Sequence, residues 1–330
     1  MNHTDPQDHI DGVLAGNRRM LSKTITLVES SLASHMVLAR KLLDSLLPHT
    51  GKAVRLGITG VPGVGKSTFI ESLGITLVAE GHRVAVLAVD PSSSRSGGSV
   101  MADKTRMEKL AVEENAFIRP SPSGGTLGGV ARKTRETMLI CEAAGYDVII
   151  VETVGVGQSE STVASMVDFF LVLMLAGAGD ELQGIKKGIL ELADAIAITK
   201  ADGDNIEKAK KAARTYQNAL HFLRLASPTW IPPVLTCSAV EKTGIHEIWQ
   251  TVLDHRRKLS DTGELAQNRR QQALDWLWSL IEEGLKIRFK QNSNVKKRLP
   301  QIARAVEKGI TTPTIAAEEL LFFLDKDELV

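Results

Sequence analysis

The chain has 330 residues, of which 43% are hydrophobic and 24% charged, and its formal net charge is +1. This length and composition are those of an ordinary soluble globular protein with one large α/β domain or two small domains. The near-neutral charge and an aromatic share of only 4% argue against a nucleic-acid-binding surface and against electrostatic attraction to a membrane.

The N-terminus carries acidic residues at Asp5, Asp8 and Asp11 and has no apolar core, so it predicts neither a signal peptide nor a transit peptide. The longest apolar run, Phe169–Ala178, is too short to span a bilayer. The two cysteines are too few for a disulfide framework. We therefore expect a cytoplasmic protein.

Residues from about 10 to 48 have a helical hydrophobic pattern. Apolar residues recur at three- and four-residue steps, first at Val13, Leu14, Leu21, Ile25, Val28 and Leu32, then at Val37, Leu38, Leu42, Leu43 and Leu46. Pro48 and Gly51 are stop signals. The pattern predicts a helical N-terminal extension at residues 1–50.

From Ala53 onward, short apolar runs alternate with helical stretches. Six runs are predicted to be strands: Val54–Thr59, Arg83–Asp90, Tyr146–Thr153, Phe169–Ala176, Ala195–Lys200 and Pro233–Ser238. Continuous apolar strands separated by helices imply a mostly parallel sheet covered by helices on both faces. We expect this α/β domain to occupy residues 51–255.

Three loops follow the ends of predicted strands or interrupt the alternation: 91–99, 120–129 and 178–187. Their composition also fits flexible linkers or solvated loops. Long loops in compact domains are often functional, and we expect these to lie near the phosphate-binding end of the sheet. The loop 178–187 is a candidate switch.

The pattern becomes helical again after about residue 256. Apolar residues form one face at Ala273, Trp276, Leu277, Leu280, Ile281 and Leu285, and others lie off it at Leu274, Trp278, Ile287 and Phe289. A helix that is apolar on two sides needs a second surface to bury against. Packing on its own domain is one interpretation, and the favoured one is a homodimer arm at residues 256–330.

Residues 60–67 read Gly-Val-Pro-Gly-Val-Gly-Lys-Ser, the Walker A spacing, between a predicted strand and a predicted helix. The glycines let backbone amides converge on a phosphate, Lys66 places an ammonium group at the β- and γ-phosphates, and Ser67 offers a hydroxyl to magnesium. The helix that follows directs its positive end at the anion. The predicted phosphate-contacting residues are Gly60, Gly63, Val64, Gly65, Lys66, Ser67 and Thr68.

Residues 199–202 read Thr-Lys-Ala-Asp at the end of an apolar strand, close to the Asn/Thr-Lys-x-Asp signature of GTPases. Asp202 can accept hydrogen bonds from the guanine ring N–H and amine, a donor pair that adenine lacks. The stem of Lys200 can pack over the base. Thr199 replaces the commoner Asn, and a helix N-cap at Asp202 is the alternative interpretation.

A second base-contacting loop is expected after the sixth strand. Cys237-Ser238-Ala239 stands where GTPases place such a loop, and Ser238, Ala239 and Val240 are its candidate residues. The fragment gains weight from its order along the chain, after the Walker A loop and after Asp202.

The third strand ends in Glu152, followed by Gly155, as in the acid-x-x-Gly element of GTPases. The acid tethers magnesium through water, and the glycine amide senses the γ-phosphate. Asp90, at the end of the second strand, and Asp103 are further candidate carboxylates near the metal, with turn or cap chemistry as the alternative.

The residue that positions the attacking water is not fixed by the sequence. Val156 stands where many GTPases have Gln, and Gln158 is the nearest candidate. With Lys66 and Glu152 as the other catalytic candidates, the sequence predicts slow intrinsic hydrolysis that a partner accelerates.

These motifs resemble the MeaB/ArgK family, the bacterial relatives of the human methylmalonic aciduria type A protein. The resemblance covers nearly the whole chain and includes longer strings than the Walker A spacing. They are 16–19 and 25–30 near the N-terminus, 60–68, 89–93, 103–107, 152–160, the loop at 179–180, and 199–202.

The resemblance implies a SIMIBI-class P-loop GTPase that works as a homodimer with GTP or GDP and Mg²⁺. It also implies a chaperone role toward adenosylcobalamin-dependent methylmalonyl-CoA mutase, in which the GTPase gates cofactor loading and protects the mutase from inactivation. Ser67, Asp90, Asp103 and Glu152 are the magnesium-site residues that it implies, and Asp180–Lys187 is the loop that it couples to the mutase.

Two other functions are compatible with a P-loop. A metal-delivering GTPase of the nickel-insertion type usually carries Cys/His ligands, whereas this chain has no Cys-x-x-Cys and only scattered His. A kinase acting on transport proteins would prefer ATP, whereas Asp202 predicts the opposite preference.

Overall fold

A computed structural model describes residues 5–89, 107–120, 127–153, 159–177, 187–220 and 227–325. The chain divides into two compact units, one that ends at Arg269 and one that begins at Arg270. Helix α12 (Glu264–Gln291) contributes residues to both units.

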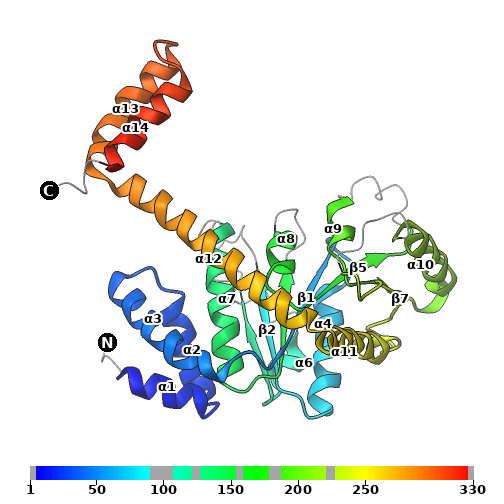
Figure 1. Ribbon diagram of the computed structural model, residues 1–330. Coiled ribbons are helices and arrows are strands. Elements are labelled where there is room, and N and C mark those ends of the chain that lie inside the picture. Colours follow the sequence, from blue (N-terminus) through cyan, green and yellow to red (C-terminus); the bar gives the residue numbers. More distant parts are fainter. Residues whose placement is uncertain are drawn as a thin grey trace. The chain divides into compact units, whose positions relative to one another are not determined.

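The first unit is built on a parallel sheet (Figure 1). Within the described residues it has seven strands in the order β3-β2-β4-β1-β5-β6-β7, and every strand pair is parallel. The strands are β1 (Val54–Gly60), β2 (Val84–Val89), β3 (Ala116–Arg119), β4 (Val148–Thr153), β5 (Phe169–Leu175), β6 (Ala195–Thr199) and β7 (Val234–Thr236). The central position of β1 places the segment after Gly60 between the carboxyl ends of β4 and β5.

The sheet confirms the predicted α/β class, and two local differences have physical reasons. Strand β3 was not among the six predicted runs, because four residues at a sheet edge give too short a hydrophobic signal. The predicted loop 120–129 is shorter than expected, because helix α7 already begins at Leu127 and tolerates the glycines in its first turn.

Helices cover both faces of the sheet (Figure 1). They are α1 (Pro6–Leu14), α2 (Arg18–Val28), α3 (Ala33–Leu46), α4 (Lys66–Ala79), α6 (Glu108–Ala111), α7 (Leu127–Ala143), α8 (Ser159–Ala164), α9 (Lys187–Glu191), α10 (Ile206–Leu220) and α11 (Ile245–Asp261). Strand side chains alternate between two apolar layers, one shared with α4 and α11 and the other with α2, α7 and α8. The apolar side chains of β1, at Val54, Leu56 and Ile58, are buried in the layer shared with α4 and α11.

The N-terminal helices share the core of the first unit. Val13, Leu21 and Ile25 are fully buried in the layer that contains α7. Side chains cap the starts of the first two helices: Asp5 accepts from the backbone of α1, and Asn17 accepts from two N–H groups of α2. Each buried aliphatic side chain contributes about 1.5–3 kcal/mol to folding.

The second unit contains the rest of α12, helix α13 (Ser293–Glu307) and helix α14 (Pro313–Asp325). Helices α13 and α14 pack through a small core of Val295, Ile302, Ala316 and Leu320. Half or more of each apolar side chain is exposed at Leu274, Leu277, Trp278 and Leu285 of α12. Among the described residues, no helix has the length and hydropathy needed to cross a membrane.

Candidate nucleotide site

The segment between β1 and α4 is a tight turn that depends on glycine. Gly60, Gly63 and Gly65 have φ angles of 157°, 80° and 93°, which side chains rarely permit. A Cβ atom on Gly60 would lie 2.5 Å from the carbonyl oxygen of Leu173 on β5. Helix α4 begins at Lys66, so the N–H groups of its first turn and its positive dipole end face the glycine-rich segment. This is the geometry of an anion-binding Walker A loop.

The side chains that follow the turn lie against the end of β4. Lys66 Nζ donates to the carbonyl oxygen of Gly60 at 2.8 Å and to that of Val61 at 3.4 Å. Ser67 Oγ donates to Glu152 Oε1 at 3.4 Å. A hydroxyl and a carboxylate are hard oxygen ligands, so Ser67 and Glu152 fit a magnesium ion beside nucleotide phosphates.

The predicted base loop is tied directly to the Walker A loop. The buried hydroxyl of Thr199 donates to the carbonyl oxygen of Val64 at 2.7 Å and lies 3.2 Å from that of Met174. Lys200 has a φ of 56°, which a non-glycine residue adopts rarely. Its carbonyl oxygen accepts a 2.6 Å hydrogen bond from the side-chain amide of Asn205. Thr199 therefore links the two halves of the site.

Asp202 interacts with the second base loop and does not cap a helix. Its carboxylate accepts a hydrogen bond from the Ser238 hydroxyl, and Ser238 Oγ accepts from the Glu241 N–H at 3.1 Å. The side chain of Asp202 makes no cap hydrogen bond to the 3₁₀ turn that follows. Ala239 is half-buried, whereas Val240 is 80% exposed beside it. The two predicted base loops are thus in contact.

Four predicted site residues, Asp90, Asp103, Gly155 and Gln158, lie outside the described residues. The candidate switch loop at 178–187 also falls outside them, apart from the backbone of Lys187 at the start of α9. Their assignments stay predictions.

Sequence reasoning missed Asn205, which fixes the backbone of Lys200. A polar residue three positions after Asp202 is common on any surface turn, so no signal in the sequence alone distinguishes this one. It also missed the role of Thr199, whose hydroxyl donates to the carbonyl oxygen of Val64.

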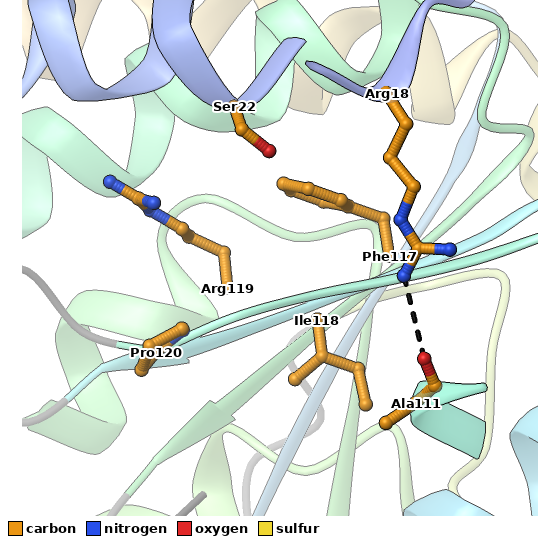
Figure 2. A pocket seen from close by; sticks show the side chains of 7 residues that line it. All are labelled: Arg18, Ser22, Ala111, Phe117, Ile118, Arg119 and Pro120. Atoms are coloured by element: carbon orange, nitrogen blue, oxygen red, sulfur yellow. Dashed lines mark hydrogen bonds between the residues drawn. The ribbon is translucent and has the colours of Figure 1, made fainter. Parts of the chain in front are cut away.

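A separate pocket lies between α2 and the edge strand β3. It is lined by Arg18, Ser22, Ala111, Phe117, Ile118, Arg119 and Pro120 (Figure 2). Figure 2 shows the Arg18 guanidinium bonded to the carbonyl of Ala111. The charge of Arg119 is already paired with Glu29. None of the predicted nucleotide-site residues lines this pocket.

The parallel sheet carries a glycine-rich phosphate loop after its central strand, and the loop that contains Asp202 is hydrogen-bonded to that phosphate loop. These features define a P-loop GTPase. The chain belongs to the MeaB family, because the family model described as "Methylmalonyl Co-A mutase-associated GTPase MeaB" matches residues 21–294. The predicted family membership and GTPase activity are confirmed.

Similar proteins and a similar crystal structure support the assignment to this family. A Caulobacter vibrioides protein named as a GTPase is 56% identical over 309 residues, which are 94% of each chain. The mouse "Methylmalonic aciduria type A homolog, mitochondrial" is 47% identical over 94% of this chain and 77% of its own length. A crystal structure described as "LAO/AO transport system kinase" is 43% identical, covers 98% of this chain and 99% of its own, and has a TM-score of 0.79.

Proposed function

We propose that this GTPase is a homodimeric, cytoplasmic chaperone of adenosylcobalamin-dependent methylmalonyl-CoA mutase. It binds GTP with Mg²⁺, gates cofactor loading and protects the mutase from inactivation. The observation that supports its guanine-nucleotide chemistry is the hydrogen bond from the Thr199 hydroxyl to the Walker A carbonyl oxygen of Val64, which joins the phosphate loop to the segment that carries Asp202. The name of its family supports the mutase as its partner.

Guanine selectivity follows from the position of Asp202. One carboxylate oxygen accepts from Ser238, which orients the group and leaves the other oxygen for the guanine N–H donors. An adenine base would leave this oxygen unpaired, at a cost of about 1–3 kcal/mol. Asp202, Lys200, Thr199 and the loop of Ser238, Ala239 and Val240 form the proposed base site.

The phosphate side of the site positions GTP for attack by water. The Walker A amides and Lys66 bind the phosphates, and Lys66 stabilises the charge that develops as the terminal phosphoryl group transfers. Ser67 and Glu152 would hold Mg²⁺, whose charge supplies further stabilisation of the phosphates. We propose Asp90 and Asp103 as additional carboxylates at this position, Gly155 as the γ-phosphate sensor and Gln158 as the water-positioning residue.

The proposed dimer uses the exposed apolar side chains of α12 in the second unit. Trp278 is 63% and Leu285 is 55% exposed in this chain. Burying such residues in a symmetric interface is favourable, at roughly 25 cal/mol per Å² of apolar surface. We expect Trp278→Glu to give a monomer by light scattering and Lys286→Glu, on an exposed polar position of α12, to leave the dimer intact. A dimeric Trp278→Glu protein would reject this surface.

The decisive experiment measures GTP hydrolysis, with ATP as control, in the presence and absence of purified methylmalonyl-CoA mutase. We expect slow GTP turnover that the mutase accelerates by about tenfold or more. Lys66→Ala controls for contaminating hydrolysis. GTP turnover that is indifferent to the mutase would retain the GTPase assignment and reject the proposed partner.

A phosphotransferase is the second candidate, because the crystal structure at 43% identity carries the description of a transport-system kinase. Incubation with γ-labelled GTP or ATP and candidate proteins separates the two, since a chaperone GTPase releases inorganic phosphate and labels no protein. Metal delivery is a third candidate, and the described residues contain no group of three or more His, Cys, Asp or Glu that could hold a metal.

A further inference from the structure

Two buried threonines join the ends of the neighbouring strands β1 and β4. Thr59 Oγ1 and Thr153 Oγ1 lie 2.7 Å apart, and the two residues are 1% and 0% exposed. The strands are in register, with Ile58 opposite Glu152, so the threonines are the next residues along the pair. The bond is therefore a direct side-chain link across the sheet at its carboxyl end.

The link stands between the two parts of the phosphate side of the site. Thr59 immediately precedes Gly60, the first residue of the Walker A loop. Thr153 immediately follows Glu152, the carboxylate that accepts from Ser67. Any change in the spacing of these strand ends moves Glu152 relative to Lys66 and Ser67.

The surroundings of the pair make the hydrogen bond hard to replace. Side chains alternate along β1, so Thr59 faces the same layer as Gly57. A Cβ atom on Gly57 would lie 2.8 Å from the Phe170 ring and 3.0 Å from Val163 on α8, which shows how closely this layer is packed. In such a low-dielectric place a hydroxyl bond is strengthened, and an unpaired hydroxyl is costly.

We propose that the Thr59–Thr153 hydrogen bond is a positioning link that sets the separation between the Walker A loop and Glu152, and that it is needed for hydrolysis but not for binding the guanine base. Neither side chain touches the nucleotide in this role. The proposal rests on the proposed magnesium-side role of Glu152 and does not depend on the mutase.

The test uses the full-length Thr59→Val, Thr153→Val, Thr153→Ser and double-valine proteins. Valine keeps the shape of threonine and removes the hydroxyl, and serine keeps the hydroxyl. We expect each single valine to lower kcat for GTP about tenfold to a hundredfold, as a small misplacement of reacting groups does. The Mg²⁺ concentration for half-maximal rate rises, while the Kd for GDP stays within about twofold because base contacts are unchanged.

The double-valine protein separates positioning from stability. It leaves no unpaired hydroxyl, so its urea midpoint returns to near that of the wild type even where a single valine fails to fold. We expect it to remain slow, and Thr153→Ser to hydrolyse GTP at close to the wild-type rate. A double-valine protein with wild-type kcat and wild-type Mg²⁺ dependence would overturn the proposal, as would GDP affinity that falls in parallel with kcat.

Two controls keep other failures apart. Thr134→Val removes a buried hydroxyl that donates to Val130 within α7, away from the site, and should leave kcat unchanged. Glu152→Gln tests the role on which the link depends. If Glu152→Gln leaves the Mg²⁺ dependence of GTP hydrolysis unaltered, the proposed role of Glu152 at the magnesium ion is rejected. This result does not depend on the behaviour of the threonine variants.

Discussion

The two ends of the parallel sheet are both polar, but their polar groups are satisfied in different ways. At the amino end, Arg55 pairs with Glu142 and Asp168 pairs with Arg269, each at 2.6 Å, and the two carboxylates are almost fully buried. At the carboxyl end, Asp202 is held by the neutral hydroxyl of Ser238. A carboxylate that is paired with a cation has its charge neutralised within the fold. A carboxylate that is hydrogen-bonded to a neutral group can still bind the donor groups of a ligand.

The amino end is the structural end. The Asp168 carboxylate accepts from two guanidinium nitrogens of Arg269 and from the backbone N–H of Arg55. Arg269 also donates to the carbonyl oxygens of Gly51 and Ala53, just before β1. Substitutions there should change stability, and substitutions at the carboxyl end should change chemistry.

The largest expected effect comes from a substitution at the amino end of the sheet. Asp168→Ala leaves the Arg269 guanidinium partly buried without its carboxylate, and we expect the free energy of unfolding to fall by about 3–5 kcal/mol. Urea denaturation followed by circular dichroism measures this loss. GTP turnover per folded molecule should remain at the wild-type level. A loss of turnover without a loss of stability would contradict the division between the two ends.

The second largest expected effect comes from a substitution at the carboxyl end of the sheet. Lys66→Ala removes the ammonium group from the phosphate site, and we expect kcat for GTP to fall by about a hundredfold to a thousandfold. Its urea midpoint should match that of the wild type, the opposite pattern to Asp168→Ala. Normal GTPase activity in Lys66→Ala would reject the Walker A assignment.

Asp202→Asn sharpens the comparison, because it removes a carboxylate that forms no ion pair with any residue in the described part of the chain. We expect the preference for GTP over ATP to fall by about tenfold to a hundredfold, since an amide presents one acceptor and one donor to the base. Competition binding with GDP and ADP measures it. Asp204→Asn, on the exposed turn two residues later, is the matched control. Unchanged discrimination in Asp202→Asn would remove this residue from the base site.

The smallest expected effect concerns an exposed ion pair, with which the stability contribution of the buried ion pairs can be compared. Glu207 and Lys210 form a 2.8 Å ion pair whose side chains are 83% and 57% exposed. Because solvent screens such pairs, we expect Glu207→Ala to shift the melting temperature by less than about 1 °C in a thermal scan. A large shift would show that exposure alone does not separate the structural ion pairs from the incidental ones.

The carboxyl end could be predicted from the sequence, because its residues are close together along the chain and their types are dictated by chemistry. Glycines with positive φ, a lysine and a serine in eight residues identify the phosphate loop, and Asp202 identifies the base. The parallel sheet followed from continuous apolar strands. The short edge strand β3 was not predicted, because Ala116–Arg119 has too few residues to show a hydrophobic periodicity.

The amino end could not be predicted in the same way. Glu142 is 87 residues from Arg55, and Asp168 is 101 residues from Arg269. One sequence contains many arginines and carboxylates, and only the fold decides which of them meet. The same limit applies to the Thr59–Thr153 pair, whose members are 94 residues apart.

Arg269 is also the sixth residue of the 28-residue helix α12, which begins at Glu264. Its guanidinium meets the Asp168 carboxylate, just before β5, and the carbonyl oxygens of Gly51 and Ala53, just before β1. One cation therefore works as a staple that holds the first turns of α12 to the entry points of two neighbouring strands.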